Sequence, residues 1–247
     1  MQIELKENER IDDLELDGLK IIQNENGFCF GMDSVLLSDF AKEIKNHSRV
    51  MDLGTGTGIL PILLSAKTQN CKFIGIEIQE EVAQMAERSV ILNELQEQIE
   101  IICEDIQNLK NKYNFGSFDA IISNPPYKKI GTGRINDEGS KLISRHEVTA
   151  TLENFISISN YLLKDQGSIY LVHRPERLVD IFVELRKYKL EPKVLRLVHP
   201  NEEKAPNLVL IKAVKNAKPF LKVLEPLYIY QKNGNYTQEI LKIYYKM

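Results

Sequence analysis

The sequence is poor in cysteine and has no long hydrophobic run. Its three cysteines, Cys29, Cys71 and Cys103, form no Cys-x-x-Cys pair and have no histidine at metal-ligand spacing, so neither a metal site nor a disulfide framework is expected. Each lies in or beside an apolar run, which predicts small buried side chains. Their odd number fits a reducing compartment. The most continuous apolar segment, residues 59–66, is far too short to cross a bilayer.

Export signals, repeats and low-complexity tracts are also absent. The N-terminus lacks a basic region followed by an apolar stretch, so we expect no signal peptide and a cytoplasmic protein. The chain has 247 residues, of which 43% are hydrophobic and 27% charged. These are ordinary globular values, and an open α/β sheet of this length commonly folds as one unit with a large core.

The net charge of −3 argues against a protein that coats nucleic acid indiscriminately. The charge is unevenly distributed, because residues 1–163 carry a net −10 and residues 164–222 a net +6. Such asymmetry is typical of a protein with one face that meets phosphates. A lysine-rich surface that contacts only solvent is the alternative.

From residue 49 onward, short β-rich runs alternate with helical ones. The predicted strands are 49–53, 72–77, 99–103, 118–123 and 168–172, and the predicted helices are 59–67, 79–93, 151–163 and 177–188. This alternation implies parallel crossovers and a doubly wound α/β sheet with helices on both faces. Two later β-rich runs, 193–198 and 208–215, predict an antiparallel pair.

The first forty residues have a different pattern. The runs 13–16 and 19–22 flank Asp17-Gly18, a strong turn signal for a β-hairpin. We interpret residues 1–40 as a hairpin extension that packs on the main domain, which we place at residues 41–247.

A glycine-rich turn, Gly54-Thr55-Gly56-Thr57-Gly58, joins the first strand of the alternating pattern to its helix. Glycines let the backbone approach a ligand closely, and the helix N-terminus presents unpaired N–H groups to it. Acidic residues mark the ends of three successive strands: Asp52, Glu77 and Asp105. An acid at the second strand end can accept hydrogen bonds from both ribose hydroxyls. The pattern favours a nucleoside-containing cofactor, with its adenine near Asp105.

The fourth strand ends in Asn124-Pro125-Pro126-Tyr127. A nicotinamide dinucleotide would fit the glycine turn equally well, but it gives no reason for this motif. Together, the run from Asp52 to Gly58 and this motif resemble the class I methyltransferases that modify planar nitrogens. In that group the Asn side-chain oxygen and the carbonyl of the first Pro accept the two hydrogens of the target amine, and the Tyr packs on the flat substrate. The resemblance implies that Asn124, Pro125 and Tyr127 are the catalytic residues.

The chemistry of the target explains such a motif. An amino group on a purine or in a carboxamide is a poor nucleophile because its lone pair is delocalised. Two fixed acceptors can hold the amine as it pyramidalises and direct its lone pair at a sulfonium methyl group, so that proximity and fixed dipoles supply most of the catalysis. No metal and no strong base are required. A tyrosine ring adds a stacking surface worth roughly 1–3 kcal/mol per base.

The resemblance also implies the fold and the cofactor. The fold is a Rossmann-like, doubly wound mixed sheet of seven strands with the N-terminal hairpin added, and the cofactor is S-adenosyl-L-methionine. The implied cofactor-binding residues follow the strand ends or precede the first strand, and they are Phe30, Met32, Asp52, Gly54, Thr55, Gly56, Gly58, Glu77, Ile78, Asp105, Ile106 and Asn124.

Residues 27–37, Gly-Phe-Cys-Phe-Gly-Met-Asp-Ser-Val-Leu-Leu, resemble the stretch before the first strand in the bacterial subfamily that methylates N6 of an adenine in valine tRNA, next to the anticodon. In relatives this stretch closes over the cofactor, which makes Asp33 a further cofactor candidate. Local propensity alone predicts that Asp33 or Ser34 caps a helix over residues 35–44. The resemblance implies tRNA as the partner, no membrane contact, and a monomer.

An RNA target needs backbone contacts and unstacked bases. The segment after the Asn-Pro-Pro-Tyr motif is basic and punctuated by glycines, which favours a substrate clamp over an ordinary solvated loop. Its candidate RNA-binding residues are Lys128, Lys129, Arg134, Arg145 and His146. His173 and Arg174, after the fifth strand, are weaker candidates for the pocket.

Several alternatives share this signature. Release-factor glutamine N5-methyltransferases usually carry an N-terminal helical bundle, unlike residues 1–40. DNA adenine methyltransferases need a large insertion for which the chain has no room, and many ribosomal-RNA guanine N2 enzymes have a duplicated domain. A non-enzymatic RNA-binding protein would have lost residues such as Asp52 or Asn124, and both are present. The resemblance favours tRNA adenine N6 methylation, with the ribosomal-RNA and protein-glutamine enzymes as alternatives.

Overall fold

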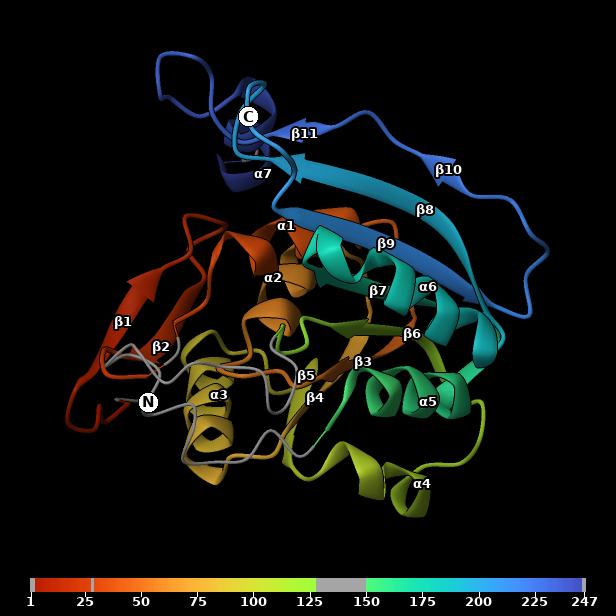
Figure 1. Cartoon of the computed structure of the whole chain (residues 1–247). Helices are drawn as coiled ribbons and strands as arrows, with labels where there is room; N and C mark the ends of the chain where they lie inside the picture. Colours follow the sequence, from red (N-terminus) through yellow and green to blue (C-terminus); the bar gives the residue numbers. More distant parts are fainter. Residues whose placement is uncertain (1–2, 28, 128–149, 246–247) are drawn as a thin grey trace, which may run out of the picture.

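A computed structural model describes residues 3–27, 29–127 and 150–245. A mixed β-sheet lies at its centre, with helices on both faces (Figure 1). The main strands are β3 (Arg49–Leu53), β4 (Lys72–Glu77), β5 (Ile99–Cys103), β6 (Phe118–Ser123), β7 (Leu163–His173), β8 (Leu190–His199) and β9 (Leu208–Lys215). These correspond to the seven strands that the sequence predicted, although β7 and β8 extend further than the predicted runs.

Two short strands, β10 (Lys222–Val223) and β11 (Leu227–Tyr228), add to the sheet beyond β8. The sheet order is β10-β8-β9-β7-β6-β3-β4-β5, with β11 also paired to β8. The described part of the sheet therefore has nine strands rather than seven, since runs of two residues show no readable periodicity. Only the pairs of β9 with β7 and β8 are antiparallel in this sheet, so the doubly wound topology is confirmed.

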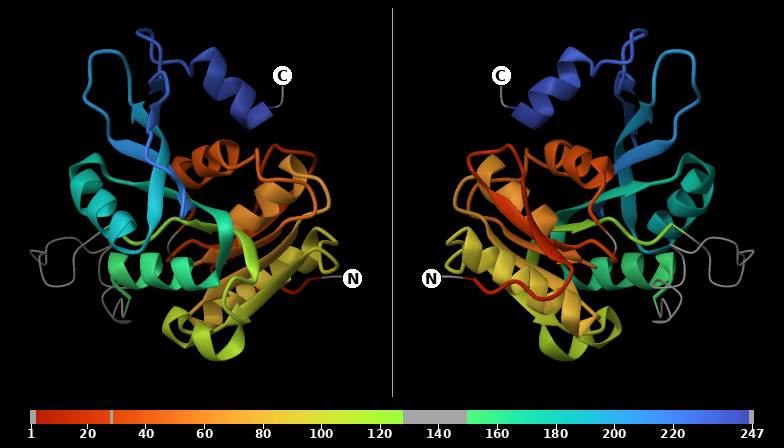
Figure 2. Two further views of the ribbon diagram at one scale, coloured as in Figure 1. Left: turned by 90° about the vertical axis from the view of Figure 1, so that its right-hand side faces the viewer. Right: turned by 90° about the vertical axis from the view of Figure 1, so that its left-hand side faces the viewer.

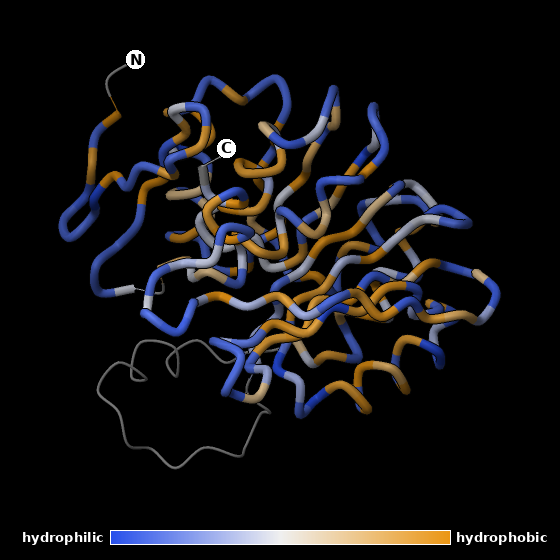
Figure 3. Tube along the Cα trace, turned by 90° about the horizontal axis from the view of Figure 1, so that it is seen from above, coloured by the Kyte–Doolittle hydropathy of each residue, from blue (hydrophilic) through white to orange (hydrophobic). Residues whose placement is uncertain are grey.

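The helices form one layer on each face of the sheet. One layer contains α1 (Met32–Phe40), α2 (Ile59–Lys67), α3 (Glu80–Leu92) and α7 (Gln238–Tyr245), and the other contains α4 (Leu109–Lys112), α5 (Leu152–Leu162) and α6 (Leu178–Lys187). Alternate strand residues face opposite layers, so Val50 and Phe73 belong to one core and Met51 and Ile74 to the other. Hydrophobic segments concentrate along these central strands (Figure 3).

The N-terminal hairpin is present, but its strands differ from the prediction. β1 (Glu9–Asp13) and β2 (Lys20–Asn24) pair antiparallel, with Asp13 opposite Lys20, so residues 14–19 form the connection instead of a two-residue turn. The strand predicted at 13–16 was wrong because Leu14 and Leu16 are buried in the core of the main sheet. Leu14 and Leu16 are apolar because they pack the hairpin connection against the main domain, not because they belong to a strand.

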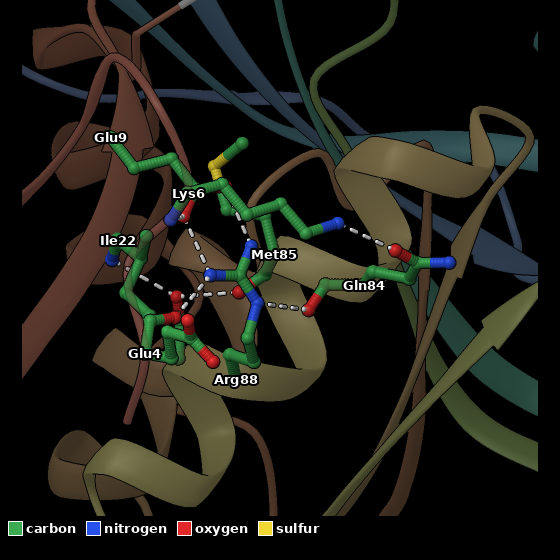
Figure 4. Close-up of polar contacts among 8 residues, drawn as sticks. Glu4, Lys6, Glu9, Ile22, Gln84, Met85 and Arg88 are labelled. Carbon is green, nitrogen blue, oxygen red and sulfur yellow. Dashed lines mark hydrogen bonds and ion pairs between the residues drawn. The ribbon is translucent and has the colours of Figure 1, made fainter. Parts of the chain in front are cut away.

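Polar contacts fasten the hairpin to α3 (Figure 4). The guanidinium nitrogens Nη1 and Nη2 of Arg88 each lie 2.6 Å from a carboxylate oxygen of Glu9, whose side chain is only 3% exposed. The hydrogen bond from Arg88 holds the pKa of Glu9 below its ordinary value. Ser89 Oγ accepts a hydrogen bond from the Ile22 N–H at 3.0 Å. Because α3 directly follows β4, these contacts attach the hairpin to the helix beside the carboxyl end of β4.

The ends of the described chain and its cysteines complete the fold. In Figure 2, α7 lies next to α1, and the connection of the N-terminal hairpin reaches it, since Leu14, Leu16, Ile243 and Tyr244 line one pocket. No helix in the described ranges is long and apolar enough to span a membrane. Cys71 is buried as predicted, but Cys29 is only partly buried and Cys103 is exposed. Cys103 escapes burial because it is the last residue of β5, which is an edge strand.

Candidate active site

The strands β3 and β6 are neighbours that end at the same edge of the sheet. Asp52 is paired with Ile122 in their register, and Ser123 Oγ donates a hydrogen bond to the Leu53 carbonyl at 2.8 Å. In the sheet, β4 and β5 lie on one side of β3, whereas β6 and β7 lie on the other. Ligands of doubly wound sheets bind at the carboxyl ends of the strands where the order reverses in this way.

The chain after β3 forms a glycine bend, residues 54–58. Gly54, Gly56 and Gly58 have φ of +74°, +57° and +84°, a left-handed conformation that side chains disfavour. Gly58 packs against α3, since a Cβ there would lie 3.4 Å from the Cβ of Ala86. A Cβ at Gly56 would meet no atom within 4 Å. The bend is therefore closed by packing at Gly58 and open to a ligand at Gly56.

Glu77, at the end of β4, supports the bend. Its Oε2 accepts a hydrogen bond from the Gly56 N–H and its Oε1 accepts one from the Gln79 N–H, both at 3.0 Å. The side chain is buried. Each carboxylate oxygen has further acceptor capacity, which suits ribose hydroxyls. Ile78, the next residue, is 48% exposed and presents an apolar surface beside the acid.

Asp52 is 1% exposed, and neither of its carboxylate oxygens has a hydrogen-bond partner among the described residues. Burial and, to a lesser extent, the negative charge of Glu77 raise the pKa of Asp52 to about 7, while nearby Thr55 partly opposes the shift. A buried carboxylate without partners is costly, and strongly shifted carboxyl groups are typical of functional sites. The orphaned acid and the open face at Gly56 fit the predicted adenosyl cofactor.

Other predicted cofactor residues have structural partners. Asp105 accepts a hydrogen bond from the Gln107 N–H at 2.8 Å and caps the short helix Ile106–Asn108. Ile106 is buried in the core beneath α5. Phe30 and Met32 pack on the opposite core, and Phe30 lines a pocket with Leu16, Leu63 and Tyr244 that includes no residue of the glycine bend. Cofactor contacts by these residues stay predictions.

The polar residues of the Asn-Pro-Pro-Tyr motif meet the start of α1. Tyr127 Oη lies 2.7 Å from Asp33 Oδ2 and 2.7 Å from Asn124 Oδ1, and Asn124 Nδ2 donates to Ser34 Oγ at 3.3 Å. Burial, followed by the charge of Asp33, raises the pKa of Tyr127. The capping prediction was wrong, because α1 begins at Met32 after Gly31, which makes no side-chain cap. Asp33 and Ser34 therefore lie within its first turn.

His173 and Arg174, at the end of β7, surround the ring of Tyr127. The centroids of the His173 and Tyr127 rings are 5.1 Å apart, and Arg174 Cζ lies 5.2 Å from the tyrosine centroid. Burial and the nearby charge of Arg177 lower the pKa of His173 to about 4. His173 Nδ1 accepts a hydrogen bond from the Arg174 N–H at 2.8 Å, so the imidazole is neutral. The structure thus brings both weaker candidates to the motif.

Residues 31–184 match the family model described as methyltransferase small domain, a span that includes the glycine bend, Glu77 and the Asn-Pro-Pro-Tyr motif. The chain belongs to this family. It is a class I methyltransferase, and its cofactor is S-adenosyl-L-methionine.

Relatives of this methyltransferase carry a more specific name. Proteins from Porphyromonas gingivalis and Tolumonas auensis, each named tRNA1(Val) (adenine(37)-N6)-methyltransferase, are 28% identical to the chain. The first match covers 86% of both chains, and the second covers 90% of this chain and 91% of its relative. A crystal structure of a predicted O-methyltransferase from Agrobacterium tumefaciens superposes with a TM-score of 0.70 at 20% identity, over 86% of this chain and 95% of that one. It supports the fold alone.

The candidate RNA-binding residues of this methyltransferase lie outside the described ranges, and they are Lys128, Lys129, Arg134, Arg145 and His146. Ser34 was not predicted as a site residue. Its contact with Asn124 joins residues 90 positions apart, and no local sequence signal reports such a contact. In the described part of the chain, no cluster of metal-ligating side chains is found.

Proposed function

We propose that this methyltransferase transfers a methyl group from S-adenosyl-L-methionine to the exocyclic N6 of an adenine in tRNA. The observation that carries the proposal is the position of Asn124 directly across the β3–β6 pair from the glycine bend. Adjacent strands are about 4.8 Å apart, so an amine held by Asn124 is within reach of a donor on the bend. The names of two relatives that match most of the chain favour tRNA, and adenine 37 of a valine tRNA in particular.

The cofactor supplies an electrophilic methyl group bound to sulfur. We assign its binding to the glycine bend and the two acids beside it. The Glu77 carboxylate is oriented by the backbone at Gly56 and Gln79, which directs its free lone pairs toward hydroxyl donors. Asp52 offers an acceptor with no hydrogen-bond partner in the described part of the chain, and Ile78 offers an apolar surface for a flat base.

The motif after β6 binds the amine. Asn124 Oδ1 and the carbonyl of Pro125 accept the two N6 hydrogens, and the proline ring fixes the backbone angle that aims this carbonyl. The ring of Tyr127 stacks on the adenine. Bound S-adenosyl-L-methionine would supply the methyl group: the N6 lone pair would form the bond to its carbon as the carbon–sulfur bond breaks, and one N6 proton would leave to water. Orientation and fixed dipoles lower the barrier.

The remaining parts of the proposal concern the RNA and the assembly. We assign phosphate contacts to the basic residues between 128 and 146, and we expect their replacement by Ala to raise KM for RNA in a salt-dependent way. We expect residues 1–40 to act as an extension of the domain formed by residues 41–247, and a monomer to be the active form in the cytoplasm. Size-exclusion chromatography with light scattering tests the oligomeric state.

The decisive experiment is incubation with labelled S-adenosyl-L-methionine and a set of unmodified tRNAs, ribosomal-RNA fragments and release factors, followed by nucleoside analysis. N6-methyladenosine in one tRNA supports the proposal. Label only in protein, or N2-methylguanosine only in ribosomal RNA, overturns it. Asn124→Ala should lower kcat about 10²- to 10³-fold, as loss of one preorganised polar group does elsewhere, with cofactor affinity nearly unchanged by calorimetry. Equal losses in both would contradict the assigned role.

A further inference from the structure

Two successive residues of α1 hold the two polar side chains of the Asn-Pro-Pro-Tyr motif. Asp33 Oδ2 lies 2.7 Å from Tyr127 Oη, and Ser34 Oγ accepts from Asn124 Nδ2 at 3.3 Å. Asp33 and Tyr127 are both partly buried. The resemblance had linked Asp33 to the cofactor, but its described hydrogen bonds run to Tyr127 and to the Ser34 N–H of its own turn.

The tyrosine hydroxyl has one proton and two oxygen neighbours. Asp33 Oδ2 and Asn124 Oδ1 both lie 2.7 Å from it, and one proton cannot be donated to both. A hydrogen bond to an ionised carboxylate is roughly twice as strong as one between neutral groups. The proton therefore resides on the Asp33 side of the hydroxyl.

This preference leaves Asn124 Oδ1 with unused lone pairs. Without a proton between them, the oxygens of Tyr127 and Asn124 repel each other at 2.7 Å. The amide oxygen gains energy by turning toward an incoming amine that offers hydrogens. If the Asp33 carboxylate were absent, the tyrosine hydroxyl would donate to Asn124 Oδ1 and occupy the acceptor that the amine needs.

We propose that Asp33 is a positioning residue for methyl transfer: by accepting the hydroxyl proton of Tyr127, it keeps the side-chain oxygen of Asn124 free for the target amine. The inference rests on the proposed function, because it assumes that Asn124 receives the amine. Asp33 itself touches neither cofactor nor substrate in this role.

The surroundings of the tyrosine ring allow this role to be separated from support of the ring. Arg174 lies over the ring, its Nη1 donates to the Asn207 carbonyl at 3.1 Å, and His173 packs against the same ring. None of these contacts involves Asp33. Loss of Asp33 should therefore redirect the hydroxyl without displacing the ring.

The test is a cycle of Asp33→Ala, Tyr127→Phe and the double variant in the full-length protein, assayed with the tRNA that the wild type methylates. Asp33→Ala should lower kcat about 10- to 100-fold, the scale of a misplaced reacting group, with KM for tRNA and the dissociation constant for S-adenosyl-L-methionine within twofold. Tyr127→Phe keeps the ring and removes the competing hydroxyl. The double variant should recover the activity of Tyr127→Phe, several-fold above Asp33→Ala.

Two further variants keep the test interpretable. Asp33→Asn retains a neutral acceptor and should have intermediate activity, and its melting temperature shows whether the helix is intact. Asp39→Ala, on the same helix and paired with Lys42 at 3.0 Å, should keep wild-type kcat. A double variant no better than Asp33→Ala, or a loss of cofactor affinity parallel to the loss of kcat, overturns the role of Asp33. A wild type inactive on every tRNA overturns the proposed function instead.

Discussion

Two buried carboxylates in this methyltransferase differ in what surrounds them. Glu9, at the hairpin–α3 contact, receives two hydrogen bonds from Arg88, and the arginine lowers its pKa. Asp52, under the glycine bend, has no hydrogen-bond partner among the described residues, and burial raises its pKa to about 7. A paired buried charge fastens two elements together, whereas an unpaired one weakens the fold and suits a ligand. The presence or absence of a charged partner thus distinguishes Glu9, a structural carboxylate, from Asp52, a functional one.

Removal of the partner of Glu9 should have the largest effect on stability. Arg88→Ala leaves the nearly buried Glu9 carboxylate without its cation, so we expect the free energy of unfolding to fall by about 3 kcal/mol. Urea denaturation measures this change. Lys6→Ala, which removes the exposed contact with Gln84, is the control and should change stability by less than about 0.5 kcal/mol. Equal effects of the two variants would contradict a special role for the buried pair.

Asp52→Asn should raise the free energy of unfolding, whereas Arg88→Ala should lower it. The pKa of Asp52 is 3.8 as a free side chain and about 7 in the fold. Between these values the folded state holds a proton that the unfolded state has lost, so the free energy of unfolding falls as pH rises from 4 to 7. The neutral amide lacks this slope. We expect the cofactor-free variant to be more stable than wild type by about 2 kcal/mol above pH 7, and by little at pH 4.

Thermal denaturation of both proteins from pH 4 to 8 measures this slope, and calorimetry should show weaker binding of S-adenosyl-L-methionine by Asp52→Asn. A variant that is less stable than wild type at pH 8 would mean that Asp52 has a structural partner.

Glycine substitutions extend the comparison between the hairpin and the glycine bend, with smaller expected changes in stability. Gly56 in the bend and Gly18 in the hairpin connection both have positive φ, and a Cβ at either would meet no atom within 4 Å. Replacement of either by Ala should cost about 1 kcal/mol of stability through backbone strain alone. Only Gly56→Ala should also weaken cofactor binding, because the added methyl group projects into the open side of the bend and the backbone strain shifts the N–H that orients Glu77. Equal cofactor affinity in the two variants would show that the glycine bend does not bind the cofactor.

The smallest effect is expected at two half-exposed isoleucines. Ile78 is 48% exposed beside Glu77, and Ile11 is 41% exposed on the hairpin. Replacement of either by Ser should change stability by less than about 0.5 kcal/mol. Ile78→Ser should weaken cofactor affinity about threefold, the scale of partial burial of an apolar side chain, and Ile11→Ser should leave it unchanged. Calorimetric titration of both variants decides whether Ile78 contacts the cofactor.

Sequence patterns predicted the regular part of the fold well. The runs that became β3 to β6 lie within a residue of their predicted bounds, because buried parallel strands are continuous apolar segments closed by glycine, acidic or proline residues. The predictions failed at Leu14 and Leu16, where tertiary burial imitates a strand, and at Asp33, where the helix begins earlier than its polar residues suggest. In both places a distant contact outweighed the local signal.

The sequence by itself determined the doubly wound topology, the glycine bend, the acids at the strand ends and the motif that carries the chemistry, because each depends on residues close together in the chain. Only the tertiary structure decided that Asp52 has no hydrogen-bond partner among the described residues, that Arg88 pairs with Glu9, and that Asp33 lies against Tyr127. Such pairings join residues up to 94 positions apart, and their energies depend on burial and distance, which local sequence does not encode.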